Sequence, residues 1–384
     1  MNTKLINNAL RVSLFAAIAF AAANVYGQGF NAGSDGSLGD VVISADTTVD
    51  LPPDGKLHYK SLTVNSGVRL KFNRNARNTP VFLLSQGDVI ISGTVSVNGS
   101  VALANNGGFA GPGGFDGGKP GFSADVPPGD GYGPGAGIGS DAGCGSTSAG
   151  GGTYGGFGAG KTSSTYGSSL LIPIIGGSGG GGGAGQPGLG GGGGGGAILI
   201  AANTRILVNG VVESRGGDNL TCFNGGSGGA IRFVSFKVEG VGTIDVRGGG
   251  SGGLGRIRVD TIDRSNLNFT FRDNSVTSVG GNLLTFPATV PALSTIEVAG
   301  NAIAQGGGPV TITLPFGSSP DRTVKIQASG FGRVVPVRVS LTPDSGGVQT
   351  FDADIDNATA NPAVAEIPVT IPVNTLVTVH AWTR

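Results

Sequence analysis

The chain has 384 residues, of which 76 are glycine, and only 12% are Asp, Glu, Lys or Arg. This length allows two or three domains with a sizeable core. Because the formal net charge is zero, the composition provides no electrostatic attraction to nucleic acid or to an acidic membrane surface, which excludes proteins that bind such polyanions through their overall charge.

The N-terminus predicts a secretory signal peptide. Lys4 and Arg11 precede an uncharged apolar run at residues 12–25, and small residues at its end place the cleavage after Gly27. This assigns residues 1–27 to the signal. No later segment reaches the ~20 apolar residues that a membrane span needs. We therefore expect an exported protein, secreted or held at the bacterial cell surface, without a transmembrane segment in the mature chain.

Between residues 40 and 99, short runs of β-branched residues such as VVIS, LHYKSLTV and DVIIS alternate with turn residues. Runs of this length and composition are typical of β-strands. No stretch beyond the signal peptide has the apolar period of about 3.6 residues that indicates a helix. The sequence therefore predicts an all-β fold with almost no helix.

A strand motif recurs three times, as GTVSVNG from Gly93, GVVESRG from Gly210 and GTIDVRG from Gly242. Each copy follows a second apolar strand, namely VFLLS, AILIA or AIRFV. Two short strands per repeating unit are typical of the stacked coils of a solenoid. We therefore predict a right-handed parallel β-helix-like solenoid over residues 28–283.

Successive side chains of a β-strand point to opposite faces, so each of the three copies divides into predicted core positions and predicted surface positions. The core set is Val95, Val97, Val212, Ser214, Ile244 and Val246. The surface set is Ser96, Asn98, Glu213, Arg215, Asp245 and Arg247. All charged residues of the three copies belong to the surface set, which makes it the first place to expect a binding site.

Residues 101–196, between the first and second copies, form a long insertion in which glycine is the commonest residue. As a free chain this insertion is a flexible loop, because glycine loses the most entropy on ordering. Alternatively, extended glycine segments share backbone hydrogen bonds, and aromatic residues such as Phe109, Phe115 and Tyr132 dock the insertion onto the solenoid. We favour the docked alternative because disordered linkers are poor in aromatic residues.

Within the insertion, residues 155–162 read GGFGAGKT and match the phosphate-loop pattern G-x-x-x-x-G-K-T. A working phosphate loop follows a buried strand and opens a helix, whose N-terminus holds the phosphates. The preceding TSAGGGTY contains no apolar strand, and the following SSTYGSSLLIPII is interrupted by Pro173. We therefore predict a glycine-rich loop that does not bind nucleotides.

Glu213, Arg215, Asp245 and Arg247, hereafter the charged row, allow two interpretations. In the first they form ion pairs between coils, with Glu213 facing Arg247 and Asp245 facing Arg215, because opposite charges on neighbouring strands attract weakly. In the second, the charged row contacts sugar acids. We treat these residues as a candidate ligand-binding site and predict no catalytic residue.

After residue 283, glycine becomes scarcer and longer alternating strands return, with Pro and Gly at the turns. Residues 284–384 are therefore predicted to form a small antiparallel β-sandwich. Trp382 lies on the same strand face as His380 and is a candidate for stacking on a sugar ring. The alternative is that Trp382 packs against a neighbouring segment.

The chain has two cysteines, Cys144 and Cys222, which an exported protein can oxidise to a disulfide. Closing the loop between them would add up to ~4 kcal/mol of stability, and the alternative is two unpaired thiols. The two histidines, His58 and His380, are far apart in sequence, so neither a zinc cluster nor a histidine-based triad is expected. We predict no metal site and no cofactor.

The chain contains several recognisable blocks: GGSGGGGGAGQPGLGGGGGGGAILIAANTRILVNGVVESRGGDN, GGSGGAIRFV, GGSGGLGRIRV, DLPPDGKLHYKSLTV and NTPVFLLSQGDVIISGTVSVNG. These blocks resemble those of a group of uncharacterised, Gly-rich exported bacterial proteins. The resemblance covers about residues 30–260 and implies a β-solenoid surface or secreted protein without assigned catalytic residues. It does not extend to the predicted sandwich.

Three functions are compatible with these features. The first is a non-catalytic structural or adhesive protein of the extracellular matrix or envelope, favoured by neutral charge and missing catalytic groups. The second is a carbohydrate-binding or polysaccharide-degrading β-helix, favoured by the charged row and by analogy with β-helix polysaccharide lyases. The third is surface recognition by flat polyglycine ridges, as in some antifreeze proteins, although regular rows of Thr are missing. The expected partner is an extracellular polysaccharide or a surface protein.

Overall fold

The computed structural model describes residues 29–102, 105–123, 126–141, 149–184, 190–218, 224–274, 276–305, 309–344 and 347–384. The signal peptide predicted up to Gly27 and the candidate disulfide between Cys144 and Cys222 lie outside these ranges. The described residues form strands and one short 3-10 helix, η1 (Arg272–Asn274), which confirms the all-β class. No helix within these ranges has the length and apolar character needed to cross a membrane.

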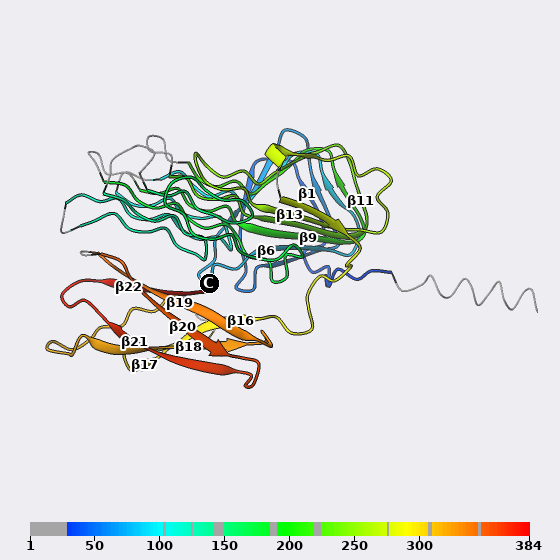
Figure 1. Ribbon diagram of the computed structural model, residues 1–384. Helices are drawn as coiled ribbons and strands as arrows, with labels where there is room; N and C mark the ends of the chain where they lie inside the picture. The colour runs from blue at the N-terminus through cyan, green and yellow to red at the C-terminus, as the bar shows by residue number, and fades with distance from the viewer. Residues whose placement is uncertain are drawn as a thin grey trace, which may run out of the picture.

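Two parallel sheets form the first part of the described chain (Figure 1). The smaller sheet has the order β14-β12-β10-β8-β5-β2. Its strands are β2 (Thr47–Asp50), β5 (Arg69–Asn73), β8 (Thr94–Ser96), β10 (Val211–Glu213), β12 (Thr243–Asp245) and β14 (Thr270–Phe271). Every pairing in this sheet is parallel, as the repeated motif predicts.

The larger sheet has the order β1-β4-β7-β9-β11-β13-β15, with β3 paired to β6 and β6 to β9. Its strands are β1 (Asp40–Ile43), β3 (Lys56–Tyr59), β4 (Ser61–Val64), β6 (Val81–Ser85), β7 (Val89–Ile91), β9 (Ala197–Val208), β11 (Ala230–Glu239), β13 (Arg256–Asp260) and β15 (Val276–Gly280). The chain passes repeatedly from one sheet to the other and back, so strands that are distant in sequence lie side by side.

The predicted core positions meet between the two parallel sheets. Val95, Val212 and Ile244 are Cα partners across β8, β10 and β12. The whole predicted core set is buried, namely Val95, Val97, Val212, Ser214, Ile244 and Val246. One apolar cluster contains residues from both sheets. Because burying an aliphatic side chain contributes about 1.5–3 kcal/mol, this shared core holds the parallel sheets together.

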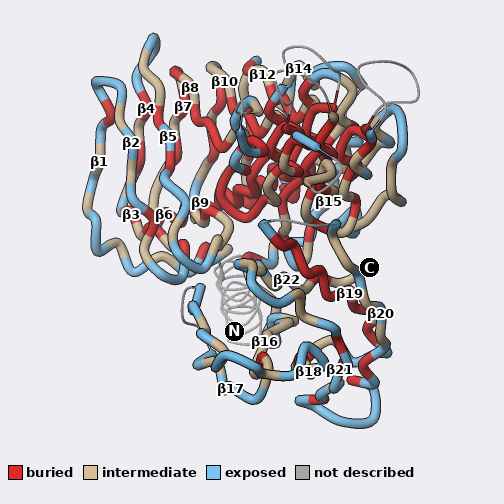
Figure 2. Tube along the Cα trace, turned by 90° about the vertical axis from the view of Figure 1, so that its left-hand side faces the viewer, coloured by how far each residue is buried: buried red, intermediate tan, exposed pale blue. Residues whose placement is uncertain are grey.

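Glycine-rich segments leave the sheets after β8, β10 and β12 and pack against one another. They comprise the described residues of 97–161, 176–196, 214–229 and 246–255, hereafter the glycine bundle. Figure 2 shows a dense block of buried backbone beside the stacked strands, and much of this block belongs to the glycine bundle. Apart from isolated bridges, its described residues belong to no strand.

Hydrogen bonding in the glycine bundle repeats every three residues. Along Gly191–Gly196, the N–H groups donate in turn to three neighbouring segments and then return to the first. The acceptors are, in order, the carbonyls of Gly118, Asn224, Ser100, Phe115, Ser227 and Val97. A turn of three residues without internal hydrogen bonds is the polyproline II conformation, and here its backbone groups bond to neighbouring segments instead of water.

Segment 190–196 is enclosed by six others. They are 97–102, 107–111, 114–119, 176–184, 214–218 and 224–229. A Cβ added to Gly194 would lie 2.0 Å from the carbonyl oxygen of Gly177, so glycine is required here by the close approach of two backbones. The described part of the insertion is therefore packed, in agreement with the docked alternative. Segments outside the insertion also contribute to the bundle, which the sequence analysis did not anticipate.

The C-terminal part forms two antiparallel sheets with the orders β17-β16-β18-β21 and β20-β19-β22. Their strands are β16 (Ala292–Val298), β17 (Asn301–Ala302), β18 (Asp321–Ser329), β19 (Val334–Pro343), β20 (Gln349–Asp356), β21 (Ala363–Thr370) and β22 (Val377–Thr383). This antiparallel pairing confirms the antiparallel arrangement predicted for residues 284–384. Val324 on β18 and Val337 on β19 belong to one apolar cluster, so the two sheets share a core.

The C-terminal sheets contact the glycine bundle. The ring of Tyr132 lies 4.5 Å from that of His380 and 6.5 Å from that of Trp382, measured between centroids. Lys119 Nζ donates to the carbonyl oxygens of Pro343 and Asp344. The glycine bundle therefore lies against residues of β22 and of the end of β19 with the residue after it.

Candidate functional site

The charged row begins at the ends of β10 and β12. Glu213 and Asp245 are Cα partners on these adjacent strands, and Ser96 on β8 continues the same row. Because the two motifs stack in register, the carboxylate of Glu213 lies beside that of Asp245, on strands about 4.8 Å apart. Like charges in this position are destabilising, so both carboxylates require nearby cations.

Three arginines supply those cations. Arg69 Nη1 donates to Glu213 Oε1 at 2.6 Å, and Arg247 Nη2 donates to Asp245 Oδ2 at 2.7 Å. Arg215 Nε lies 3.8 Å from Asp245 Oδ2. The predicted pairing of Asp245 with Arg215 is confirmed, whereas the predicted pairing of Glu213 with Arg247 is wrong.

Two features explain the change of partner. Arg69 reaches Glu213 from β5 across the intervening β8, where the residues in register are the small Thr94 and Ser96. Arg247 instead bonds to Asp245, two residues earlier in its own chain, and lies 3.6 Å from Asp273. Arg69 and Asp273 were missed by the sequence analysis. Arg69 was visible only as one of two basic residues, with Lys71, in the alternating strand VRLKF.

The carboxylates of the charged row are buried, which corrects the prediction that Ser96, Glu213 and Asp245 lie on the surface. Glu213 is 8% exposed and Asp245 5%, whereas the side chains of Arg69 and Arg215 are 42% and 44% exposed. A long arginine stem covers the neighbouring surface and keeps its charged head in water. The charged row and the neighbouring Arg69 therefore offer guanidinium groups to solvent, with the carboxylates beneath them.

Asp245 is held ionised by its arginines. Burial raises the pKa of this carboxyl, but hydrogen bonds from Arg247 and the charges of Arg247 and Arg215 outweigh burial and hold the pKa below its usual 3.8. A carboxyl with a lowered pKa is a poor general acid near neutral pH. We therefore assign Asp245 a structural role.

The lowered pKa of Asp245 predicts a pH-dependent contribution to stability. The contribution is complete above the unfolded pKa of about 3.8 and is lost as the pH falls through the lower folded pKa. Asp245→Asn should lower the free energy of unfolding by about 1 kcal/mol at pH 6, because the arginines are partly exposed, and by less at pH 2.5. Urea denaturation at both pH values measures this difference.

The matched control is Asp54→Asn, which removes an exposed carboxylate 4.0 Å from Lys56. It should change the free energy of unfolding less than Asp245→Asn does at pH 6. An Asp245→Asn effect that is equal at the two pH values would contradict the assigned ionic role.

Arg215 has a hydrogen-bond donor that no described residue accepts. Its Nε is buried without a partner, because Asp245 Oδ2 at 3.8 Å is too distant for a hydrogen bond. Guanidinium groups bind carboxylates through paired, planar hydrogen bonds. Arg69, Arg215 and Arg247 together therefore have the chemistry to bind an acidic sugar.

Trp382 does not form an exposed platform for a sugar. It is 8% exposed, and its ring makes an edge contact with Tyr132 of the glycine bundle. Packing against a neighbouring segment, the alternative considered for this residue, is what the structure shows. The indole cannot stack on a ligand at the surface while this contact is in place.

All but the last of residues 155–162, which match the phosphate-loop pattern, lie in the glycine bundle. Gly155 N and Gly156 N both donate to the carbonyl oxygen of Leu254. Among the described residues, no strand ends directly before this segment and no helix begins directly after it. The helix N-terminus that holds phosphates in a working phosphate loop is therefore not formed here.

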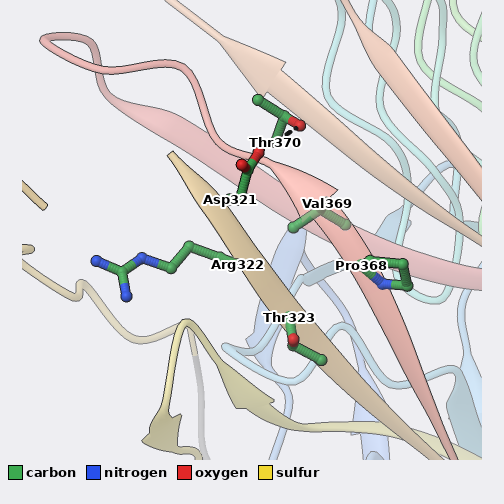
Figure 3. Close-up of a pocket in the computed structure, with 6 residues that line it drawn as sticks. All are labelled: Asp321, Arg322, Thr323, Pro368, Val369 and Thr370. Atoms are coloured by element: carbon green, nitrogen blue, oxygen red, sulfur yellow. Dashed lines mark hydrogen bonds between the residues drawn. The ribbon is translucent and has the colours of Figure 1, made fainter. Parts of the chain in front are cut away.

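A shallow depression lies over β18 and β21 (Figure 3). Its walls are Asp321–Thr323 and Pro368–Thr370, which are Cα partners in one antiparallel pair. Thr370 Oγ1 donates to Asp321 Oδ1 at 3.2 Å, and Figure 3 shows the side chain of Arg322 extending away from the other residues. These groups do not converge on a common point, so we assign no chemistry to this depression.

Within the described ranges, no group of three or more His, Cys, Asp or Glu side chains is arranged to hold a metal ion. Comparison with protein-family models, with curated proteins and with solved structures finds no match. A functional assignment therefore depends on the charged row, the glycine bundle and the cavities of this chain.

Proposed function

We propose that the protein is a secreted or cell-surface, non-catalytic structural or adhesive component of the extracellular matrix or envelope. The observation that carries the proposal is the glycine bundle, in which backbone segments bond laterally to as many as six neighbours. Such packing gives a rigid body, because each segment is fixed from several sides. Export through the signal peptide predicted at residues 1–27, and membership of the Gly-rich exported bacterial proteins, belong to the same proposal.

The parallel sheets, in this proposal, wind as a right-handed β-helix with the glycine bundle projecting from one corner. Its support is the order of the strands: the chain passes through β1, β2 and β3 and then through β4, β5 and β6, which pair in parallel with β1, β2 and β3 respectively. Right-handed crossovers are the rule between parallel strands. An elongated body of this kind suits a protein that spans distance at a cell surface.

A second candidate function is the binding of acidic polysaccharides by the charged row. The partly exposed Arg69 and Arg215 and the unpartnered Nε of Arg215 favour it. Glu213 and Asp245 are both engaged by arginines, which favours binding over hydrolysis. The ligand would be a chain of sugar acids whose carboxylates accept hydrogen bonds from the guanidinium groups.

Sedimentation with insoluble or cross-linked polysaccharides tests both functions. The mature protein is mixed with acidic polygalacturonate and alginate and with neutral cellulose, and supernatants are assayed for new reducing or unsaturated ends. Binding to any of these polymers without product release supports the adhesive function, and product release overturns it. A protein that binds none of them and does not self-associate in sedimentation velocity also contradicts the structural proposal.

Variants separate the charged row from other surfaces. Arg215→Met combined with Arg247→Met should weaken binding to polygalacturonate by about thirtyfold, since each of the two charge-assisted pairs contributes roughly 1 kcal/mol. Arg338→Met removes a similarly exposed arginine from β19, where it pairs with Asp352, and should leave binding unchanged. Equal losses in the two variants would contradict a role for the charged row.

A further inference from the structure

A cavity of about 380 Å³ lies where the parallel sheets, the glycine-rich chain and the C-terminal sheets meet. Its walls include residues 171–175, 285–287 and 381–383 together with residues of β6, β9 and β11. The volume falls within the range of small-molecule sites, about 300–1,000 Å³. This cavity, hereafter the junction cavity, is partly open to solvent and is separate from the charged row.

Most of the junction cavity wall is apolar. Phe82, Phe115, Phe286, Phe331 and Trp382 contribute aromatic side chains to it. Phe82 and Phe286 also pack edge to face, with ring centroids 5.2 Å apart. A wall of this composition favours a ligand with an aromatic or acyl body.

Thr285 provides one polar group in the wall. It is 7% exposed, and its Oγ1 is buried without a hydrogen-bond partner among the described residues. Buried hydroxyl groups are normally hydrogen-bonded because an unpaired one is costly. A ligand oxygen beside Thr285 would satisfy this donor.

Arg232, which also lines the cavity, provides a charge that is not balanced locally. Its Nε and Nη2 donate to Asp260 Oδ2 at 3.1 and 2.9 Å, and Arg258 donates to the other oxygen of the same carboxylate. Arg232 and Asp260 are 1% and 0% exposed, and Arg258 is 8% exposed. Two guanidinium charges therefore share one carboxylate, which leaves one buried positive charge uncompensated.

The register of β11 and β13 places the two positive charges side by side, so the excess of positive charge is a property of the sheet itself. Arg232 and Arg258 are Cα partners on β11 and β13, and Asp260 is the sole acid paired with either among the ion pairs of the described residues. Nearby Leu284 and Asn282 contribute only backbone carbonyl oxygens to Arg232. Buried charges are normally paired, so the cavity is suited to an anion.

We propose that the junction cavity binds a small amphipathic carboxylate, whose carboxylate accepts hydrogen bonds from Arg232 and Thr285 and whose apolar body packs against the aromatic wall. The single negative charge of the ligand balances the excess positive charge of Arg232, Arg258 and Asp260. Such a ligand would also bridge the parallel sheets and the C-terminal sheets, because it contacts Arg232 on β11 and Trp382 on β22.

Trp382 is the single tryptophan of the chain, so its fluorescence reports directly on the cavity. The full mature protein is titrated with 4-phenylbutyrate, with decanoate and with the uncharged 4-phenyl-1-butanol, by fluorescence and calorimetry. We expect 4-phenylbutyrate to bind and the alcohol to bind at least about tenfold more weakly, while decanoate tests whether an acyl body is also accepted. No signal from either carboxylate up to the millimolar range, or equal affinity for acid and alcohol, overturns the proposal.

Two variants and a control locate the site. Arg232→Met leaves Arg258 and Asp260 as a balanced pair and should abolish the preference for acid over alcohol. Thr285→Val should weaken carboxylate binding severalfold, whereas Arg215→Met on the charged row should not change it. If Arg232→Met still binds the acid more tightly than the alcohol, the proposal is overturned. If circular dichroism shows that Arg232→Met is unfolded, the acid and alcohol comparison and Thr285→Val decide the question.

Discussion

Gly194→Ala is expected to lower the free energy of unfolding by about 3 kcal/mol, the upper part of the usual range for an overpacked interior. The added Cβ would lie 2.0 Å from Gly177 O and 2.4 Å from Gly177 C. Both obstacles are backbone atoms, which cannot rotate away as a side chain does. Urea denaturation followed by far-ultraviolet circular dichroism measures the change.

The control for this substitution is Gly347→Ala. A Cβ at Gly347 meets nothing within 4 Å, and Gly347 has no positive φ. Alanine there should stabilise the protein by up to about 1 kcal/mol, because it restricts the unfolded chain. Opposite signs for the two substitutions would confirm that backbone contact sets the cost at Gly194. Similar small effects would show that the glycine bundle accommodates side chains.

Asp260→Asn is expected to lower the free energy of unfolding by about 3–5 kcal/mol, the usual cost of removing one partner from a buried ion pair. The substitution keeps the size of the side chain but leaves Arg232 and Arg258 facing each other without a counter-charge. Both arginines donate hydrogen bonds to Asp260, so both lose their ionic partner at once. Thermal and urea denaturation measure the effect.

Asp352→Asn is the matched control, since Asp352 pairs with Arg338 and Arg384 on exposed parts of β19, β20 and the chain end. Exposed ion pairs contribute about 1 kcal/mol or less, so this variant should remain close to the unmodified protein. If Asp260→Asn were equally mild, the positive charge near the junction cavity would have to be compensated by other means.

The strands were predictable because their signal is local. GTVSVNG, GVVESRG and GTIDVRG place the same residue types at the same offsets, and parallel in-register pairing follows once the three copies stack. Val95, Val212 and Ile244 are buried as alternation predicts. The alternation of side chains along a strand does not show what covers the outer face of the sheet. Glu213 and Asp245 were therefore expected at the surface, whereas the structure shows them buried.

The partners of the charged and aromatic residues were less predictable, because they depend on contacts between distant segments. Arg69 precedes Glu213 by 144 residues in the chain, and nothing near either residue indicates the other. Trp382 packs on Tyr132 through a contact between the glycine bundle and β22. Arg232 is a single charge within the apolar strand AIRFV, and its neighbours Arg258 and Asp260 become relevant only when the register is known.

The packing of the glycine-rich insertion was predicted from the sequence, but the arrangement of its hydrogen bonds was not. Composition and the presence of Phe115 and Tyr132 favoured a docked insertion. The three-residue period of its hydrogen bonds leaves no trace in side-chain pattern, because glycine has no side chain to alternate. For the same reason, the participation of 214–218 and 246–249 could not be inferred from their sequence alone.

The glycine bundle also affects how stability depends on temperature. Its interior buries peptide groups and little hydrocarbon, and exposing peptide groups on unfolding lowers the heat-capacity change, whereas exposing hydrocarbon raises it. A smaller heat-capacity change flattens the curve of stability against temperature. Because hydrocarbon burial stabilises less as the temperature falls, a body held together by peptide hydrogen bonds is expected to lose less of this contribution on cooling than a hydrocarbon core does.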